Sequence, residues 1–221
     1  NLKAQELVAD IHFIHGDIRS TANVREIAAK ANTDYTLIYT KYTTLSFVLF
    51  ALERMEALIE DTQAAMVYAD HFNQVGEVRT NAPVIDYQLG SVRDDFEFGS
   101  VLFYRTSALK EAVARMDVDY QYAGLYDLRL KVSQKGALEH INEYLYYDVE
   151  LDNRTTGEKN FDYVDPKNRG VQIEMEQAAT QHLKDINGYL APGFKDVDLL
   201  GGGFEYEASV IIPCKNRVRT I

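Results

Sequence analysis

Short apolar and β-branched runs alternate along the chain with longer segments whose apolar side chains recur every three or four residues. The runs at 9–15, 35–40 and 65–69 predict strands, because β-branched and aromatic residues or a period of two dominate them. The segments 20–31 and 45–60 predict helices, since their apolar residues follow a helical period. Strands that alternate with helices in this way are typical of an α/β domain with a mainly parallel sheet covered by helices.

The pattern is looser after residue 73, and its elements are shorter. We expect short β pieces around Gly76 and Gly90, a strand over 98–104, a helix from Thr106 to about 116, a helical piece over 128–135, a strand or hairpin over 137–149 and a helix over 172–190. Residues 151–168 are polar and irregular. Three glycines at 201–203 predict a flexible hinge, and 208–213 form an apolar strand that ends in proline.

Composition and charge exclude several classes of function. The net charge of −11 argues against a nucleic-acid surface, which needs clustered lysine and arginine. A single cysteine, Cys214, excludes an internal disulfide framework and a zinc site with several cysteines. We find no apolar run long enough to span a membrane and no recognisable signal peptide.

The sharpest chemical signal is the run Ser209 to Arg217, with sequence SVIIPCKNR. An apolar strand ends at Pro213, and a polar loop with Lys215 and Asn216 follows it. Ligands of open α/β sheets bind at the carboxyl ends of strands. The run resembles the first strand and nucleotide loop of inverting family 2 glycosyltransferases.

This resemblance implies a GT-A-like fold, with a central, mostly parallel mixed sheet flanked by helices. It implies transfer of a sugar, with inversion, from a nucleotide-sugar donor to a glycan or glycolipid acceptor, in the cytoplasm or at the inner face of the membrane. The family also uses Mg²⁺ or Mn²⁺, which carboxylates hold against the leaving diphosphate. The nucleotide-binding residues that the resemblance implies are Pro213, Lys215, Asn216, Asp17, Arg25 and Lys41.

The metal-binding motif is altered in this chain. Residues 24–43 follow the family frame, but its Asp-x-Asp falls on Thr40, Lys41 and Tyr42, which cannot hold a divalent cation comparably. Lys41 could offset diphosphate charge directly, or it could be an ordinary surface lysine at a strand end. No cofactor is therefore assigned.

Asp70 and His71 are the other metal candidates, because they follow a predicted strand and would lie near the cleft. They are weak ones, since adjacent residues on a strand point to opposite faces.

The catalytic base is also altered. The family's Glu-Asp pair falls on Gly124 and Leu125, and leucine cannot deprotonate an acceptor hydroxyl. Asp127, in register with a later aspartate of the family, is the candidate substitute; the alternative for this residue is a structural role.

The family's first strand stands last in this chain. Joined end to start, the sequence follows the usual family order, and Asp17 then falls near the aspartate that reads the base. We predict a domain over 1–200 with a helical or irregular extension from 151, a hinge over 201–207, and the first strand of a glycosyltransferase domain over 208–221. That strand either begins an adjoining second domain or pairs within the sheet of domain 1–200. If it pairs with the sheet of a neighbouring copy, the result is a strand-swapped homo-oligomer.

Two functions stay open, and a third possibility concerns the fold. The chain either transfers sugar or is a catalytically degenerate glycosyltransferase-like module that binds a glycan, a nucleotide or an active second domain. Alternatively, it is an unrelated doubly wound α/β domain that shares only the rhythm of strands and helices.

Overall fold

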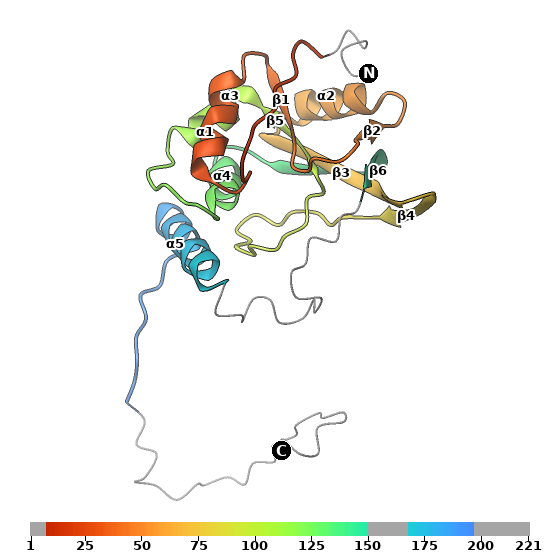
Figure 1. The fold of residues 1–221 in the computed structure, drawn as a ribbon. Coiled ribbons are helices and arrows are strands. Elements are labelled where there is room, and N and C mark those ends of the chain that lie inside the picture. The colour runs from red at the N-terminus through yellow and green to blue at the C-terminus, as the bar shows by residue number, and fades with distance from the viewer. Residues whose placement is uncertain (1–7, 150–167, 197–221) are drawn as a thin grey trace, which may run out of the picture. The chain divides into compact units, whose positions relative to one another are not determined.

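A computed structural model describes residues 8–149 and 168–196 (Figure 1). The chain divides into two units, over 1–189 and 190–221, and all helices and strands below belong to the first. Residues 9–15 form no strand, contrary to the prediction, and Phe13 is exposed. An alternating run becomes a strand only when a neighbour pairs with its backbone, and the neighbour expected for it, 208–213, lies outside the described residues.

The six described strands form one curled mixed sheet in the order β1-β5-β3-β6-β2, with β4 paired to β3. Their bounds are β1 Tyr35–Tyr39, β2 Ser46–Phe47, β3 Met66–Val75, β4 Val78–Ala82, β5 Val101–Arg105 and β6 Leu138–Val149. Between described strands, only β3 and β6 pair in parallel, and the other pairings are antiparallel. The expectation of a mostly parallel sheet is therefore wrong for this part of the chain.

The direction of the strands explains this difference. β1 and β3 run the same way, as a strand–helix–strand crossover requires, and β6 runs with them. β5 inserts between β1 and β3 in the opposite direction, after a long segment over 83–100 without helix or strand. The β piece expected around Gly90 is absent, whereas Gly76, with φ of 60°, lies in the turn that joins β3 to β4.

Helices cover both faces of the sheet. α1 (Thr21–Lys30), α3 (Thr106–Val113) and α4 (Gly124–Ser133) share one hydrophobic cluster with one face, and α2 (Ala51–Thr62) shares a second cluster with the other. Ser20 caps α1, since its side chain accepts from the amide of Asn23 at 3.2 Å. The helix predicted from residue 45 begins only at Ala51, because Ser46 and Phe47 pair with β6.

α5 (Arg169–Asp185) packs on α4 through the carboxylate of Glu174 as well as through apolar contacts. Glu174 accepts from the backbone amides of Gln121, Tyr122 and Ala123 at 3.2, 2.6 and 3.1 Å, immediately before α4 begins. A carboxylate at this place accepts from the amides of the loop that leads into α4, and the positive end of the helix dipole stabilises its charge.

We predict that Glu174→Ala lowers the free energy of unfolding by about 2 kcal/mol, because three amides lose a charged acceptor. Chemical denaturation measures the change. Glu176→Ala, at an exposed position of the same helix, is the matched control and should change stability by less than about 0.5 kcal/mol. Equal stabilities of the two variants would contradict the capping role.

Candidate functional site

Five residues gather where β1 ends, at the place that the family resemblance aligns with the Asp-x-Asp motif. We call them the β1-end cluster: Lys41, His71, Ser100, Tyr146 and Asp148. Thr40 donates its amide to the carbonyl of Ser100 at 2.9 Å, which extends the β1–β5 pairing to the residue before Lys41. β3 and β6 lie side by side and supply the other members.

The charged pair of the cluster is Lys41 and Asp148. The Nζ atom of Lys41 lies 2.7 Å from Oδ2 of Asp148, and the hydroxyl of Tyr39 lies 3.3 Å from Oδ1. The Asp148 side chain is fully buried, whereas that of Lys41 is 32% exposed. A buried carboxylate is destabilising unless a partner offsets its charge. The lysine predicted to meet a diphosphate is therefore already matched by an internal charge.

The aromatic part of the cluster is closely packed. The rings of His71 and Tyr146 stack with centroids 5.1 Å apart, and the Tyr146 hydroxyl accepts from the amide of Ser100 at 3.0 Å. Gly99 leaves no room here for a side chain, because a Cβ would meet the Tyr146 hydroxyl and lie 3.3 Å from Nδ1 of His71. Burial lowers the pKa of His71 and raises that of Tyr146 to about 12. Both groups are therefore neutral near pH 7.

Asp70 and His71 have different partners, as adjacent strand residues should. Asp70 accepts from the amide of Val84 at 2.8 Å and lies 2.9 Å from Nε2 of His140, whereas His71 stacks on Tyr146. Within residues 8–149 and 168–196, no three histidine, cysteine or acidic side chains are grouped as metal ligands. The arrangement does not support the weak metal prediction for Asp70 and His71.

Gly124 and Leu125, which the resemblance aligns with the family's Glu-Asp pair, both pack against other parts of the chain. At Gly124 a Cβ would lie 2.6 Å from the carbonyl carbon of Ser20 and 2.8 Å from the carbonyl oxygen of Arg19, and closer still to the amide of Thr21. The Gly124 amide donates to the Arg19 carbonyl at 2.6 Å. Leu125 packs against the hydrophobic cluster of α1, α3 and α4. Neither position can present a carboxylate to a cleft.

Asp127 is buried as well. Its residue surface is 2% exposed, and its carboxylate forms an ion pair with Lys131, one turn later in α4. Burial raises the pKa of Asp127, against the opposing effect of Lys131. An acceptor hydroxyl cannot reach a carboxylate in this position, so the placement disfavours the predicted role as base.

Two other nucleotide-binding candidates have structural partners. Asp17 binds Arg19 through both carboxylate oxygens, and this hydrogen bonding lowers the pKa of Asp17. Arg25 donates to the carbonyl of Met116 at 2.6 Å and pairs with Asp119. Neither contact involves the β1-end cluster. Pro213, Lys215 and Asn216, together with the hinge and the terminal strand, lie outside the described residues.

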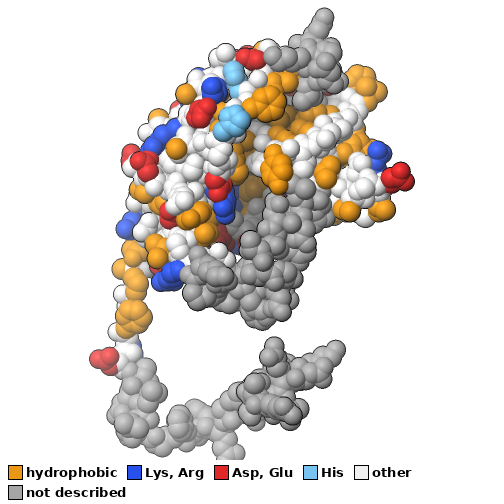
Figure 2. Space-filling model, viewed as in Figure 1, with side chains coloured by type: hydrophobic (Ala, Val, Ile, Leu, Met, Phe, Trp, Pro, Cys, Tyr) orange, Lys and Arg blue, Asp and Glu red, His pale blue; other side chains and the backbone are white. Residues whose placement is uncertain are grey.

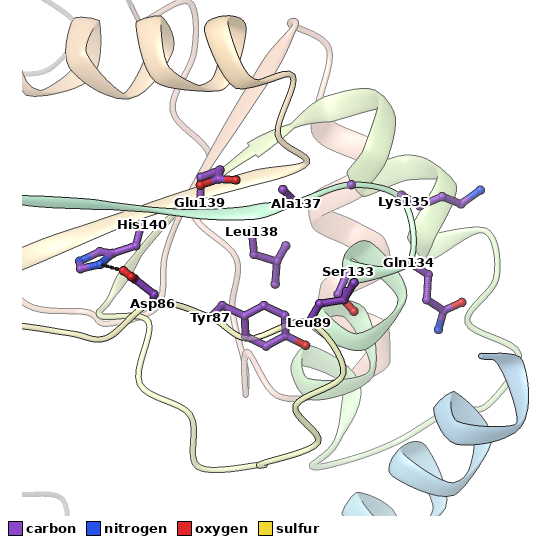
Figure 3. Close-up of a pocket in the computed structure, with 11 residues that line it drawn as sticks. Asp86, Tyr87, Leu89, Ser133, Gln134, Lys135, Ala137, Leu138, Glu139 and His140 are labelled. Atoms are coloured by element: carbon purple, nitrogen blue, oxygen red, sulfur yellow. Dashed lines mark hydrogen bonds and ion pairs between the residues drawn. The ribbon is translucent and has the colours of Figure 1, made fainter. Parts of the chain in front are cut away.

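A pocket of about 630 Å³ opens where β6 begins (Figure 3). His140 lies on its wall, with Nδ1 2.7 Å from Asp86 and Nε2 2.9 Å from Asp70. Neither His140 nor Asp86 is among the site residues predicted from the sequence. They stand 54 residues apart in the chain, and no local motif signals that they meet.

The surface charge and the length of the helices bear on whether the chain binds nucleic acid or crosses a membrane. On the face in Figure 2, cationic and anionic side chains lie interspersed, without a basic patch over the described residues. Within residues 8–149 and 168–196, no helix is both long enough and apolar enough to cross a membrane.

Comparisons with known proteins add little to this description. No family model and no curated protein matches the chain. Among solved structures, the chain is similar to residues 1–349 of Staphylococcus aureus TarS, crystallised in complex with UDP-GlcNAc, with 12% identity and a TM-score of 0.38. The match covers 61% of this chain and 38% of the TarS chain. A TM-score of this size does not establish a shared fold.

Proposed function

We propose that this chain is a catalytically degenerate glycosyltransferase-like module that binds a ligand but does not transfer sugar. One observation carries the proposal: the residues at the positions that the resemblance assigns to catalytic carboxylates make packing contacts or ion pairs within the chain. A transferase of this type needs a cation on the leaving diphosphate and a base on the acceptor.

The Asp-x-Asp position has no carboxylate that could bind a divalent cation. Lys41 stands at the Asp-x-Asp position and pairs with Asp148, whose carboxylate is fully buried. If Lys41 turned toward a diphosphate, Asp148 would be left as an uncompensated buried charge, which costs several kcal/mol. The pair therefore favours a structural role for this lysine.

The positions expected for the catalytic base are occupied by residues that pack inside the domain. Gly124 lies against the backbone of residues 19–21, and the half-buried Leu125 packs against the hydrophobic cluster of α1, α3 and α4. Asp127, the remaining candidate, is held by Lys131 inside the molecule. An acceptor hydroxyl would find no exposed carboxylate at any of these three positions.

Calorimetric titration with uridine diphosphate, with and without Mn²⁺, tests the proposal, together with an assay for uridine diphosphate released from UDP-sugars. We expect no effect of Mn²⁺ on binding of the nucleotide and no release above that of buffer. A Mn²⁺ titration without nucleotide controls for weak metal binding, and an active family 2 enzyme controls for the assay. Metal-dependent nucleotide binding with release of uridine diphosphate would overturn the proposal in favour of sugar transfer.

A further inference from the structure

We infer that the pocket at the start of β6 binds a neutral sugar unit. This β6 pocket is lined by Asp86, Tyr87, Leu89, Ser133, Leu138 and His140, among others. The inference rests on the proposed function, because it names the ligand class of the proposed binding module. The site is separate from the β1-end cluster, with which it shares no lining residue.

The pocket has an apolar wall that a sugar ring can cover. Tyr87, Leu89 and Leu138 form this wall (Figure 3). Tyr87 packs against Phe96 and Phe98, with ring centroids 5.5 and 5.8 Å away. A fixed aromatic ring beside aliphatic groups suits the C–H face of a pyranose, since its π face carries negative potential.

The pocket also has a fixed polar end. Asp86 is 89% exposed and uses Oδ1 to contact His140, whereas the His140 side chain is only 6% exposed. Asp70 holds the other ring nitrogen and also accepts from Val84. The ring of Tyr68 stacks on that of His140 with centroids 5.2 Å apart. Asp86 therefore presents a carboxylate whose position is set in advance, which suits a pair of sugar hydroxyls.

The charges of the pocket disfavour a phosphate. Lys135 lines the rim, but it pairs with Glu111 at 3.0 Å and points away from Tyr87 and Leu138 (Figure 3). Glu139 likewise points away from these two residues (Figure 3). A phosphate would meet the Asp86 carboxylate with no free lysine beside it. A simple cation would gain little, because ion pairs with exposed carboxylates contribute about 0–1 kcal/mol. A neutral ligand rich in hydroxyls fits best.

The same contacts hold the segment 84–87 on the sheet. Tyr68 accepts from the amide of Tyr87 at 2.7 Å and donates to the carbonyl of Ile85 at 2.8 Å. His140 and Asp70 belong to this anchor, so substituting them would disturb the fold. Asp86 and Leu89 are exposed, by 89% and 84%, and are the residues through which binding can be tested separately.

The experiment is an NMR titration of the isotope-labelled full chain with N-acetylglucosamine, glucose and galactose. We expect at least one sugar to shift the amide signals of residues lining the β6 pocket. Asp86→Asn should weaken that binding about fivefold, which corresponds to about 1 kcal/mol. Leu89→Ala should weaken it too, whereas Asp94→Asn, an exposed residue of the same segment outside the pocket lining, should not.

Three results would overturn the inference: no sugar shifts signals of the pocket, the Asp86→Asn chain binds as tightly as the original, or spermidine or uridine monophosphate binds the pocket while the sugars do not. Failure here is distinguishable from failure of the proposed function. Metal-dependent release of uridine diphosphate would refute a degenerate module even if the pocket binds sugar.

Discussion

Gly124→Ala is expected to lower the free energy of unfolding by about 3 kcal/mol. The first residue of α4 lies directly on the backbone of residues 19–21, and a methyl group would stand 2.6 Å from the carbonyl carbon of Ser20. Backbone atoms cannot turn aside as a side chain can, so α1 and α4 would have to separate. Forcing extra atoms into packed contacts costs about 1–3 kcal/mol, and sometimes more. Denaturation with urea, followed by circular dichroism, measures the loss.

Gly170→Ala is the matched control for this prediction. Gly170 is also a helical glycine, but its nearest neighbour for a new Cβ is a ring carbon of Tyr122 at an ordinary 3.7 Å. Alanine should therefore be neutral or stabilise α5 by up to about 1 kcal/mol. If Gly124→Ala is as stable as Gly170→Ala, the close contact is wrong, and one support of the degenerate-module proposal is lost.

Lys131→Met is expected to destabilise the chain by about 3–5 kcal/mol, the range for breaking a buried ion pair by removing one partner. The side chains of Lys131 and Asp127 are 8% and 3% exposed, so the remaining carboxylate would be buried without its cation. The double variant Lys131→Met, Asp127→Asn should recover much of this loss. Lys30→Met, which breaks the exposed pair with Glu26, should cost less than about 0.5 kcal/mol.

This prediction has a pH dependence. Burial already raises the pKa of Asp127 above its ordinary value of 3.8 in the original chain. Between 3.8 and the folded pKa, the folded chain holds a proton that the unfolded chain has released, so the contribution of Asp127 to stability falls as pH rises through this window. Without Lys131 the folded pKa rises further, and the fall should be larger and extend to higher pH. The contribution should vanish in the double variant.

Unfolding experiments from pH 4 upward compare the original chain, Lys131→Met and the double variant. The difference between Lys131→Met and the double variant isolates Asp127, since other titrating groups are shared. A difference that does not change with pH would contradict the assignment of the buried charge to Asp127.

Several elements could be predicted from local signals in the chain. Ser20 marks the start of α1, and the β-branched and aromatic runs at 35–40 and 137–149 predict β1 and β6, because caps and strand-forming residues act over a few positions. The helix that begins at Thr106 also follows the prediction, whereas the helix predicted over 172–190 runs from Arg169 to Asp185. The sequence also shows that Thr40, Tyr42 and Leu125 stand where the glycosyltransferase resemblance would place motif carboxylates.

The way these elements meet depends on contacts between distant parts of the chain. The antiparallel insertion of β5 and the pairing of Ser46 and Phe47 with β6 are choices of backbone partner, which no short window of sequence contains. The burial of Asp127 and the meeting of Asp86 with His140 likewise depend on segments that fold together from distant places. Periodicity reports which face of an element is apolar, but the neighbour that covers this face, and the charges it brings, are set by packing of the whole chain.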